Sequence, residues 1–164
     1  MLNGLTESQT EELKADLAQL PPCFNEIKDA ILSGTGYWYP LSGKESALKP
    51  AAYSLDKIYR DGRIDLLESI LEKAEITEVT AFHPFWHEHS RGSKWKTIAD
   101  MKSYICERDD TGYNFPWIDE TYYFDKSGSR IIYVSHEGTI TFAGERLSGI
   151  PESIIPGKYK YNRG

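Results

Sequence analysis

The sequence is poor in cysteine and has no long apolar run, and each shortage excludes a class of protein. Only two of the 164 residues are cysteines, Cys23 and Cys106, and no C-x-x-C pair occurs. A disulfide-rich scaffold is therefore excluded, whereas a reducing compartment or a single disulfide stays open. No stretch approaches about eighteen apolar residues, and no basic segment precedes an apolar run near Met1, so we expect neither a membrane span nor a signal peptide. We expect a cytosolic protein.

The chain also lacks the surplus of basic residues that nucleic-acid binding requires. Its formal net charge is −6, from 19 Lys and Arg against 25 Asp and Glu. Residues 1–82 hold 8 basic and 14 acidic residues, whereas residues 83–164 hold 11 of each, so the net charge lies in the first half. Phosphate backbones attract basic surfaces, so this charge argues against a nucleic-acid partner. It fits a basic protein partner, or simply a soluble acidic surface.

What the sequence does contain is a globular mixture of apolar, charged and aromatic residues, at 40%, 27% and 13%. A chain of this length fits one domain, which buries about two-thirds of its unfolded surface. No internal repeat and no long linker divides it. We therefore predict a single α+β domain over residues 1–164, with N-terminal helices packed on a C-terminal antiparallel β-meander.

The meander is the strongest local signal in the chain. Three segments, Thr121–Phe124, Arg130–Ser135 and Thr139–Phe142, are rich in aromatic and β-branched residues. Their connectors, residues 125–129 and 136–138, are short, polar and contain glycine, as hairpin loops require. Alternation places Tyr122, Phe124, Ile132 and Val134 on one set of faces and Tyr123, Ile131 and Tyr133 on the other. Neither set is polar, so we expect both faces to be covered.

Helical spacing dominates the first half of the chain. Thr6 and Gln9 form a capping box at the start of a helix that ends before Pro21, and a second helix is predicted over Phe24–Leu32. After an irregular stretch, the helical pattern returns at Ala51 in two pieces separated by Asp61-Gly62. The second piece, Arg63–Ala74, carries acidic residues on the side opposite its apolar stripe.

The segments between these helices and the meander are less regular. Glu75–Phe82 is a candidate strand that could join the sheet, and Trp95, Ile98, Met101 and Ile105 mark the apolar side of another helix. Arg108–Pro116 is predicted to be a loop. A short helical turn is expected over Glu152–Ile155.

Histidines cluster at one place, where His83, His87 and His89 surround Glu88. Imidazoles and a carboxylate are ligands that zinc accepts, so a small metal-dependent hydrolase is one hypothesis. The spacing is not H-E-x-x-H, and Pro84 opposes the helix that would bring His83 and His87 together. An extended segment would spread the three imidazoles over ~20 Å at about 3.3 Å per residue, so a polar loop without metal is the competing interpretation.

Two other groups admit a catalytic interpretation and a structural one. Cys106 could act as a nucleophile with His136 or His89, but it continues an apolar helical stripe, which favours a buried structural thiol. His136-Glu137 lies in the connector between the last two strands. Side-chain to backbone hydrogen bonds in Ser135–Gly138 would fix that hairpin, and we favour this structural role.

Aromatic residues concentrate in the expected loops. They either anchor an interface or plug the ends of the core, and the Tyr37-Trp38-Tyr39 group could alternatively line a small-molecule pocket. The eight rings in question are Tyr37, Trp38, Tyr39, Phe85, Trp86, Tyr113, Phe115 and Trp117. Carboxylates near such rings would steer a basic partner. The carboxylates expected to be exposed for this role are Glu68, Glu72, Asp109, Asp110, Asp119 and Glu120.

The meander also resembles a known group of proteins. Tyr122-Tyr123-Phe124, Ile131-Ile132-Tyr133, Ser135-His136-Glu137-Gly138-Thr139 and Thr141-Phe142-Ala143-Gly144 are similar to the C-terminal portion of bacterial immunity proteins encoded beside polymorphic toxins of the contact-dependent growth inhibition type. The resemblance covers the last third of the chain. It implies a cytosolic, non-enzymatic and often acidic protein that blocks a toxin domain by occupying or obstructing its active site. It assigns no functional residue. We expect no cofactor.

The first hypothesis is therefore an immunity protein that binds and neutralises a cognate toxin domain, which we expect to be a basic nuclease. The metal-dependent hydrolase and the small-molecule-binding module stay open as alternatives from other classes.

Overall fold

The computed structural model of the chain describes residues 6–33, 46–84, 95–109, 112–113, 120–147 and 149–161. Two compact units are present, Met1–Ser46 and Ala47–Gly164, and each is described by itself. Helices and an antiparallel sheet occur in the same chain, which confirms the α+β class. A single domain over residues 1–164, with the N-terminal helices packed on the meander, stays a prediction.

The first unit contains two helices joined by a short 3-10 turn. These elements are α1 (Glu7–Leu17), η1 (Pro22–Phe24) and α2 (Asn25–Leu32). The predicted capping box is confirmed, since the Gln9 backbone N–H donates to Thr6 Oγ1 at 3.1 Å and the Thr6 N–H donates to Gln9 Oε1 at 2.9 Å. Lys28 Nζ donates to the Leu20 carbonyl at 2.7 Å, which ties α2 to the segment after α1.

The second unit is built on a six-stranded antiparallel sheet with the order β1-β8-β7-β6-β2-β3. The strands are β1 (Ala51–Ser54), β2 (Val79–Phe82), β3 (Trp95–Ile98), β6 (Thr121–Asp125), β7 (Arg130–Val134) and β8 (Thr139–Gly144). The predicted meander is confirmed as β6, β7 and β8, which occupy the middle of the sheet. Strands from earlier in the chain extend it on both sides.

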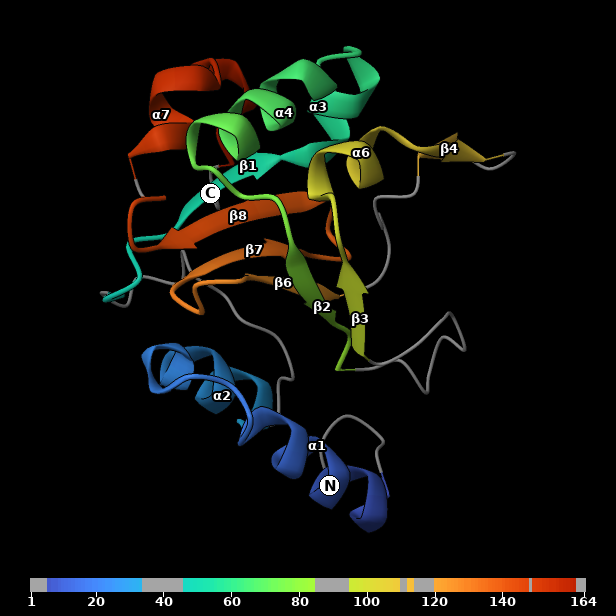
Figure 1. The fold of residues 1–164 in the computed structure, drawn as a ribbon, viewed down its shortest axis with the longest axis vertical. Helices are drawn as coiled ribbons and strands as arrows, with labels where there is room; N and C mark the ends of the chain where they lie inside the picture. Colours follow the sequence, from blue (N-terminus) through green and yellow to red (C-terminus); the bar gives the residue numbers. More distant parts are fainter. Residues whose placement is uncertain are drawn as a thin grey trace. The chain divides into compact units, whose positions relative to one another are not determined.

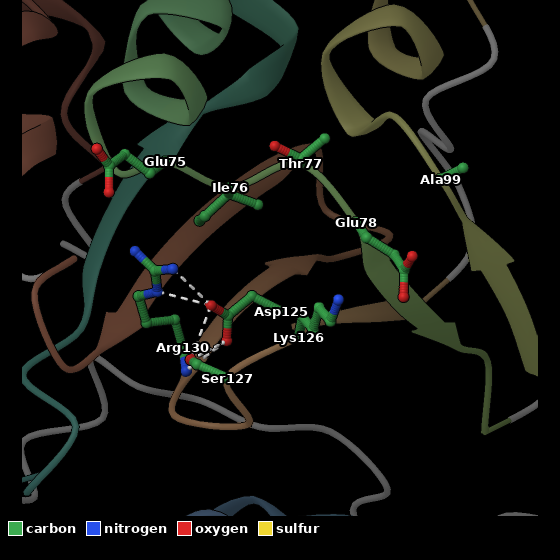
Figure 2. Close-up of a pocket in the computed structure, with 9 residues that line it drawn as sticks. All are labelled: Glu75, Ile76, Thr77, Glu78, Ala99, Asp125, Lys126, Ser127 and Arg130. Atoms are coloured by element: carbon green, nitrogen blue, oxygen red, sulfur yellow. Dashed lines mark hydrogen bonds and ion pairs between the residues drawn. The ribbon is translucent and has the colours of Figure 1, made fainter.

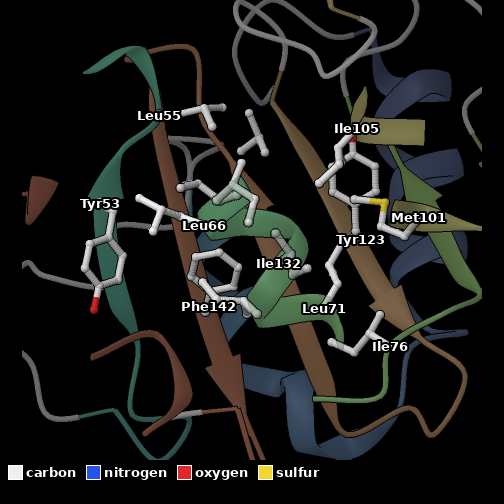
Figure 3. Close-up of a cluster of buried hydrophobic side chains, with 14 of the residues drawn as sticks. Tyr53, Leu55, Leu66, Leu71, Ile76, Met101, Ile105, Tyr123, Ile132 and Phe142 are labelled. Atoms are coloured by element: carbon white, nitrogen blue, oxygen red, sulfur yellow. The ribbon is translucent and has the colours of Figure 1, made fainter. Parts of the chain in front are cut away.

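Helices lie along one face of this sheet, as Figure 1 shows. They are α3 (Leu55–Arg60), α4 (Ile64–Lys73), α6 (Met101–Cys106), α7 (Ile150–Ile154) and the 3-10 turn η2 (Gly157–Tyr159). Their apolar residues and those of the strands form one buried cluster, part of which is shown in Figure 3. Ile70 and Met101 in this cluster have no accessible surface. Burying large apolar side chains stabilises the fold by about 1.5–3 kcal/mol each.

Strand register determines which side chains share a face. Tyr123 lies opposite Ile132, and Ile132 lies opposite Phe142, so these three belong to the helix-covered face. Tyr122 lies opposite Tyr133 on the other face, with ring centroids 4.5 Å apart. The expectation that neither face is polar is confirmed. The proposed grouping of Tyr122 with Ile132 is wrong, because alternation within a strand does not fix its register against the next strand.

The prediction of helix from Ala51 onward is wrong for its first four residues. Ala51–Ser54 forms the edge strand β1, which pairs with β8 from Ala51 opposite Phe142 to Ser54 opposite Thr139. Helix α3 begins only at Leu55, where Ser54 Oγ accepts a hydrogen bond from the Lys57 N–H at 3.3 Å. Long-range pairing therefore overrides a local preference for helix.

The prediction of a helix from Trp95 to Cys106 fails in the same way. Trp95–Ile98 is the strand β3, paired with β2, and the Trp95 ring stacks on Phe82 with centroids 4.4 Å apart. Helix α6 starts at Met101, capped by Asp100, whose carboxylate accepts from the Ser103 N–H at 3.3 Å. Trp95, Ile98 and Met101 recur every three residues, as apolar residues do on one side of a helix. In the structure, however, Trp95 and Ile98 belong to a strand, and only Met101, after the Asp100 cap, is helical.

Two further segments differ in part from their predictions. The predicted loop Arg108–Pro116 contains two short paired strands, β4 (Arg108–Asp109) and β5 (Gly112–Tyr113). The candidate strand Glu75–Phe82 joins the sheet only from Val79 onward, because Glu75 has a left-handed conformation with φ 57° that ends α4. The short helical turn expected at Glu152–Ile155 is confirmed as α7.

The outer side of β1 is occupied by the C-terminal part of the chain. Tyr53 forms an isolated antiparallel bridge with Lys160, and the Tyr161 N–H donates to the Ala52 carbonyl at 3.0 Å. β3 forms the opposite edge of the sheet, where the side chains of Lys96 and Thr97 are exposed. One edge of the sheet is therefore partly covered by the C-terminal segment, and the other presents exposed polar side chains.

Candidate functional site

A buried ion pair organises the turn between β6 and β7. The Asp125 carboxylate lies 2.7 Å from Arg130 Nη2, with only 4% and 14% of the two side chains exposed. It also accepts from Arg130 Nε at 2.7 Å, from the Arg130 backbone N–H at 3.2 Å and from Ser127 Oγ at 2.8 Å. Both oxygens of Asp125 are thus saturated by donors from its own turn, which satisfies the buried charge.

The same arginine connects the turn to the end of α4. Arg130 Nη1 donates to the carbonyl of Ala74, the residue that caps the helix. Beyond Ala74 the helix closes in a Schellman arrangement, in which the Ile76 N–H donates to the Leu71 carbonyl at 2.9 Å and the Glu75 N–H to the Glu72 carbonyl at 3.1 Å. The helix end and the hairpin turn are therefore fixed to each other.

A pocket of about 390 Å³ lies between these fixed elements, and Figure 2 shows its lining. We call it the α4-end pocket, and it is lined by Glu75, Ile76, Thr77, Glu78, Ala99, Asp125, Lys126, Ser127 and Arg130. Its floor contains the Asp125–Arg130 ion pair. Its rim carries three further charged side chains, Glu75, Glu78 and Lys126, all exposed. Within the described part of the chain, none of these three makes an ion pair within about 4 Å.

The proposed partner-binding carboxylates of α4 lie next to this pocket. Glu72 is on the last turn of α4, three residues before Glu75, and its side chain is 74% exposed. Lys102 on α6 approaches it to 3.8 Å, a surface pair that is worth little energetically. Glu68 is half-buried one turn earlier. Asp65 and Glu72 are therefore exposed acidic residues of α4, whereas Glu68, which was expected to be exposed, is half-buried beside Cys106 of α6.

Glu68 also bears on the interpretation of Cys106. Burial, and secondarily the neighbouring Glu68 carboxylate, raise the pKa of the Cys106 thiol. The thiol packs at the margin of the core cluster, as the structural interpretation expected. A raised pKa disfavours the thiolate that a nucleophile needs, so these surroundings favour the structural role over the catalytic one.

Glu120 differs from its expected exposure, because only 4% of it is accessible. Its carboxylate accepts from the His136 backbone N–H at 2.9 Å, and it also contacts His136 Nδ1 and the Tyr133 hydroxyl. Burial raises the pKa of Glu120, and its hydrogen bonds from His136 partly oppose that rise. Glu120 therefore links the start of β6 to the β7–β8 connector through hydrogen bonds. It is not the exposed binding residue that the sequence predicted.

The β7–β8 connector is held in the way the sequence predicted. Ser135 Oγ and Thr139 Oγ1 are hydrogen bonded at 2.6 Å, and the Glu137 N–H donates to Ser135 Oγ at 3.2 Å. The Gly138 carbonyl accepts from the Leu55 N–H at 2.8 Å, which connects the hairpin to the start of α3. The structural use of this connector is therefore supported by its own hydrogen bonds. No local pattern predicts that Glu120 binds this connector, because Glu120 and His136 are 16 residues apart in the sequence.

Several predicted residues lie outside the described residues. They include Asp110, Asp119, His87, Glu88, His89 and the aromatic group Tyr37–Tyr39. Asp109 belongs to β4. Of the three histidines proposed as metal ligands, only His83 is described, and it is buried. Across the described ranges, no group of three or more His, Cys, Asp or Glu side chains could hold a metal ion.

Within the same ranges, no helix has the length and apolar character needed to cross a bilayer. No family model, no curated protein and no solved structure matches this chain.

Proposed function

We propose that this protein is a cytosolic binding protein that neutralises a cognate toxin domain by obstructing its active site. The observation that carries the proposal is the acidic side of α4, where Glu72 is 74% exposed and Glu68 is half-buried on a core-anchored helix. The opposite face of α4 is held by Leu67, Ile70 and Leu71, whose exposures are 2%, 0% and 3%. Carboxylates on so rigid a support can meet a partner at little entropic cost.

The chemistry of this face indicates a basic partner. A basic nuclease domain has the charge that would be steered toward these carboxylates, and its active site must itself attract phosphate. A complex of standard size would cover roughly 800 Å² on each partner, more than one short helix offers. The α4-end pocket and the start of α6 are adjacent surfaces that could complete it. The proposal gives this chain no catalytic step of its own.

The alternative hydrolase draws no support from a specific observation. Its proposed ligands are His83, which is buried, and His87 and His89, which lie outside the described residues. The small-molecule module likewise depended on Tyr37–Tyr39, outside the described residues. Both alternatives therefore remain predictions from the sequence.

The decisive experiment is co-expression with the C-terminal domain of the large secreted protein encoded immediately upstream, if the gene has such a neighbour. We expect that domain to arrest growth by itself, and we expect this chain to restore growth and to co-purify with it as a stable 1:1 complex. Continued killing in the presence of well-expressed, folded chain would refute the proposal. A co-purified complex without restored growth would refute the block of the active site.

A matched pair of variants tests the surface. Glu68→Gln/Glu72→Gln removes two charges from the α4 face, and Glu145→Gln/Glu152→Gln removes two exposed charges elsewhere in the same unit. We expect the α4 variant to weaken toxin binding by about tenfold, mainly through slower association at low salt. The control variant should bind like wild type. Equal effects of the two variants would show that only net charge matters and would remove α4 from the interface.

A further inference from the structure

The α4-end pocket is a preformed cavity, because its walls are tied together by backbone and side-chain hydrogen bonds. Arg130 joins the β6–β7 turn to the Ala74 carbonyl. The Met101 N–H donates to the Thr77 carbonyl at 2.8 Å, which fixes the start of α6 against the segment after α4. Its volume of about 390 Å³ lies within the range of small-ligand pockets, about 300–1,000 Å³. A side chain or a small ligand can therefore enter without refolding the walls.

The donors in the pocket are already used, so an anion finds few free hydrogen bonds there. Arg130 directs Nε and Nη2 to Asp125 and Nη1 to Ala74. Ser127 Oγ and the Arg130 backbone N–H are also directed to Asp125. The guanidinium charge is neutralised by a carboxylate at 2.7 Å. Among the described residues that line the pocket, Lys126 is the one cation left without an ion pair.

The uncommitted acceptors of the pocket favour a cation instead. Glu75 and Glu78 both line the cavity with no ion pair among the described residues, and Figure 2 shows them on either side of it. Together they outnumber Lys126. The C-terminal end of α4 also reaches this site, and the negative end of a helix dipole attracts positive charge. Ile76 lines the pocket but is only 5% exposed, so the pocket offers little apolar surface.

From these groups we infer that the α4-end pocket receives an arginine side chain of a protein partner. Arginine fits better than lysine because its planar guanidinium donates several hydrogen bonds at once to carboxylates and carbonyls. The inference rests on the proposed function, since the pocket adjoins Glu72 on the α4 face. The inference predicts which part of the toxin this chain recognises, namely a basic side chain that projects far enough to enter the pocket.

The pocket can be tested without any toxin. The isolated chain is titrated with N-acetyl-arginine amide, and backbone amide shifts are followed by NMR. We expect saturable shifts at Glu75–Glu78 and at Lys126–Ser127, and none with N-acetyl-citrulline amide, which keeps the shape but lacks the charge. Glu75→Gln/Glu78→Gln should weaken binding by about tenfold or more, whereas Glu145→Gln/Glu152→Gln should leave it unchanged.

Three outcomes would overturn the pocket as an arginine site. They are equal shifts with citrulline, shifts spread over exposed acids outside the pocket, and saturable shifts with inorganic phosphate at the same amides. Because Glu75 and Glu78 are both exposed, we expect the double variant to keep the fold of wild type, and its amide spectrum outside the pocket checks this directly.

The toxin titration separates this inference from the proposed function. If the toxin domain binds wild type but binds Glu75→Gln/Glu78→Gln equally well, the pocket is not where the partner enters, and the proposed function stands. If the arginine amide binds as expected and no toxin domain does, the proposed function fails and the pocket stands as an arginine site. Loss of both interactions in the double variant would support both.

Discussion

Gly144 ends β8 in a conformation and a location that both require glycine. Its φ is +101°, and a Cβ at this position would lie 2.2 Å from the Ser129 carbonyl oxygen and 2.9 Å from Arg130 Cα. These neighbours are backbone atoms that pair with β8, so they cannot rotate away. The Ser129 carbonyl is further held by the Glu145 N–H at 3.1 Å. Gly144→Ala therefore introduces strain and overlap at the same point.

The expected loss can be separated into two parts. An L-residue held at positive φ costs about 1–2 kcal/mol, and forcing a methyl group into a packed site costs about 1–3 kcal/mol more. We therefore expect Gly144→Ala to lower the free energy of unfolding by about 2–5 kcal/mol, a large share of the roughly 5–15 kcal/mol typical of a domain. Urea unfolding followed by far-UV circular dichroism measures it, provided that the transition slope is unchanged.

Two other glycines serve as controls for the two parts. Gly62 has φ +66° with no atom within 4 Å of where an alanine Cβ would lie, so Gly62→Ala should show backbone strain alone, about 1 kcal/mol. Gly149 has neither strain nor a neighbour, so Gly149→Ala should change stability by less than about 0.5 kcal/mol. If Gly144→Ala costs no more than Gly62→Ala, the close approach of β8 to Ser129 is refuted.

Three further predictions concern the site. Arg130→Met leaves the buried Asp125 carboxylate without its cation and should cost about 3–5 kcal/mol in urea unfolding. Arg63→Met, which breaks the exposed Arg63–Asp65 pair, should cost far less, and equal losses would contradict the burial argument. Glu75→Gly relieves a left-handed residue in the α4 cap and should raise stability by about 1 kcal/mol in the same assay, and a loss would argue against the Schellman geometry. Burial raises the pKa of Glu120 above its ordinary 4.5, so its contribution to stability is full below pH 4.5 and is lost as pH rises through the folded-state pKa. The difference in unfolding free energy, wild type minus Glu120→Gln, should therefore fall between pH 4.5 and neutral pH, and a constant or rising difference would reverse the assigned cause.

The parts of the fold that the sequence predicted are those with local causes. The capping box at Thr6 and Gln9 needs only residues three apart, and the β6–β7–β8 meander needs only short polar connectors. Both are determined by neighbours in the chain. The same is true of the Ser135–Gly138 connector, where the hydrogen bond between Ser135 and Thr139 spans four residues.

The parts that failed depend on partners distant in sequence. Ala51 becomes a strand because Phe142 lies opposite it, and Trp95 does so because Phe82 lies opposite it. Glu120 is buried because Tyr133 and His136 close over it from another strand and its connector. A charge in a polar stretch of sequence predicts exposure, but only tertiary structure can supply the donors that permit its burial.

The candidate site shows the same division. The acidic side of α4 follows from spacing within one helix, so Glu72 was found. The α4-end pocket combines a helix end, a strand start and a hairpin turn, and no local pattern unites Glu75, Glu78 and Arg130. The unusual backbone of Glu75 was also invisible, because Gly rather than Glu is the ordinary residue at that point of a helix cap.

The pairing of the C-terminal segment with β1 bears on self-association. An edge strand with free backbone groups is a template on which further strands can assemble, and proteins blunt such edges with cover or with charge. Here Lys160 and Tyr161 occupy part of the outer side of β1, while the opposite edge, β3, is short and carries the exposed Lys96. We therefore expect a chain shortened before Lys158 to expose the outer side of β1 and to self-associate more readily through that edge.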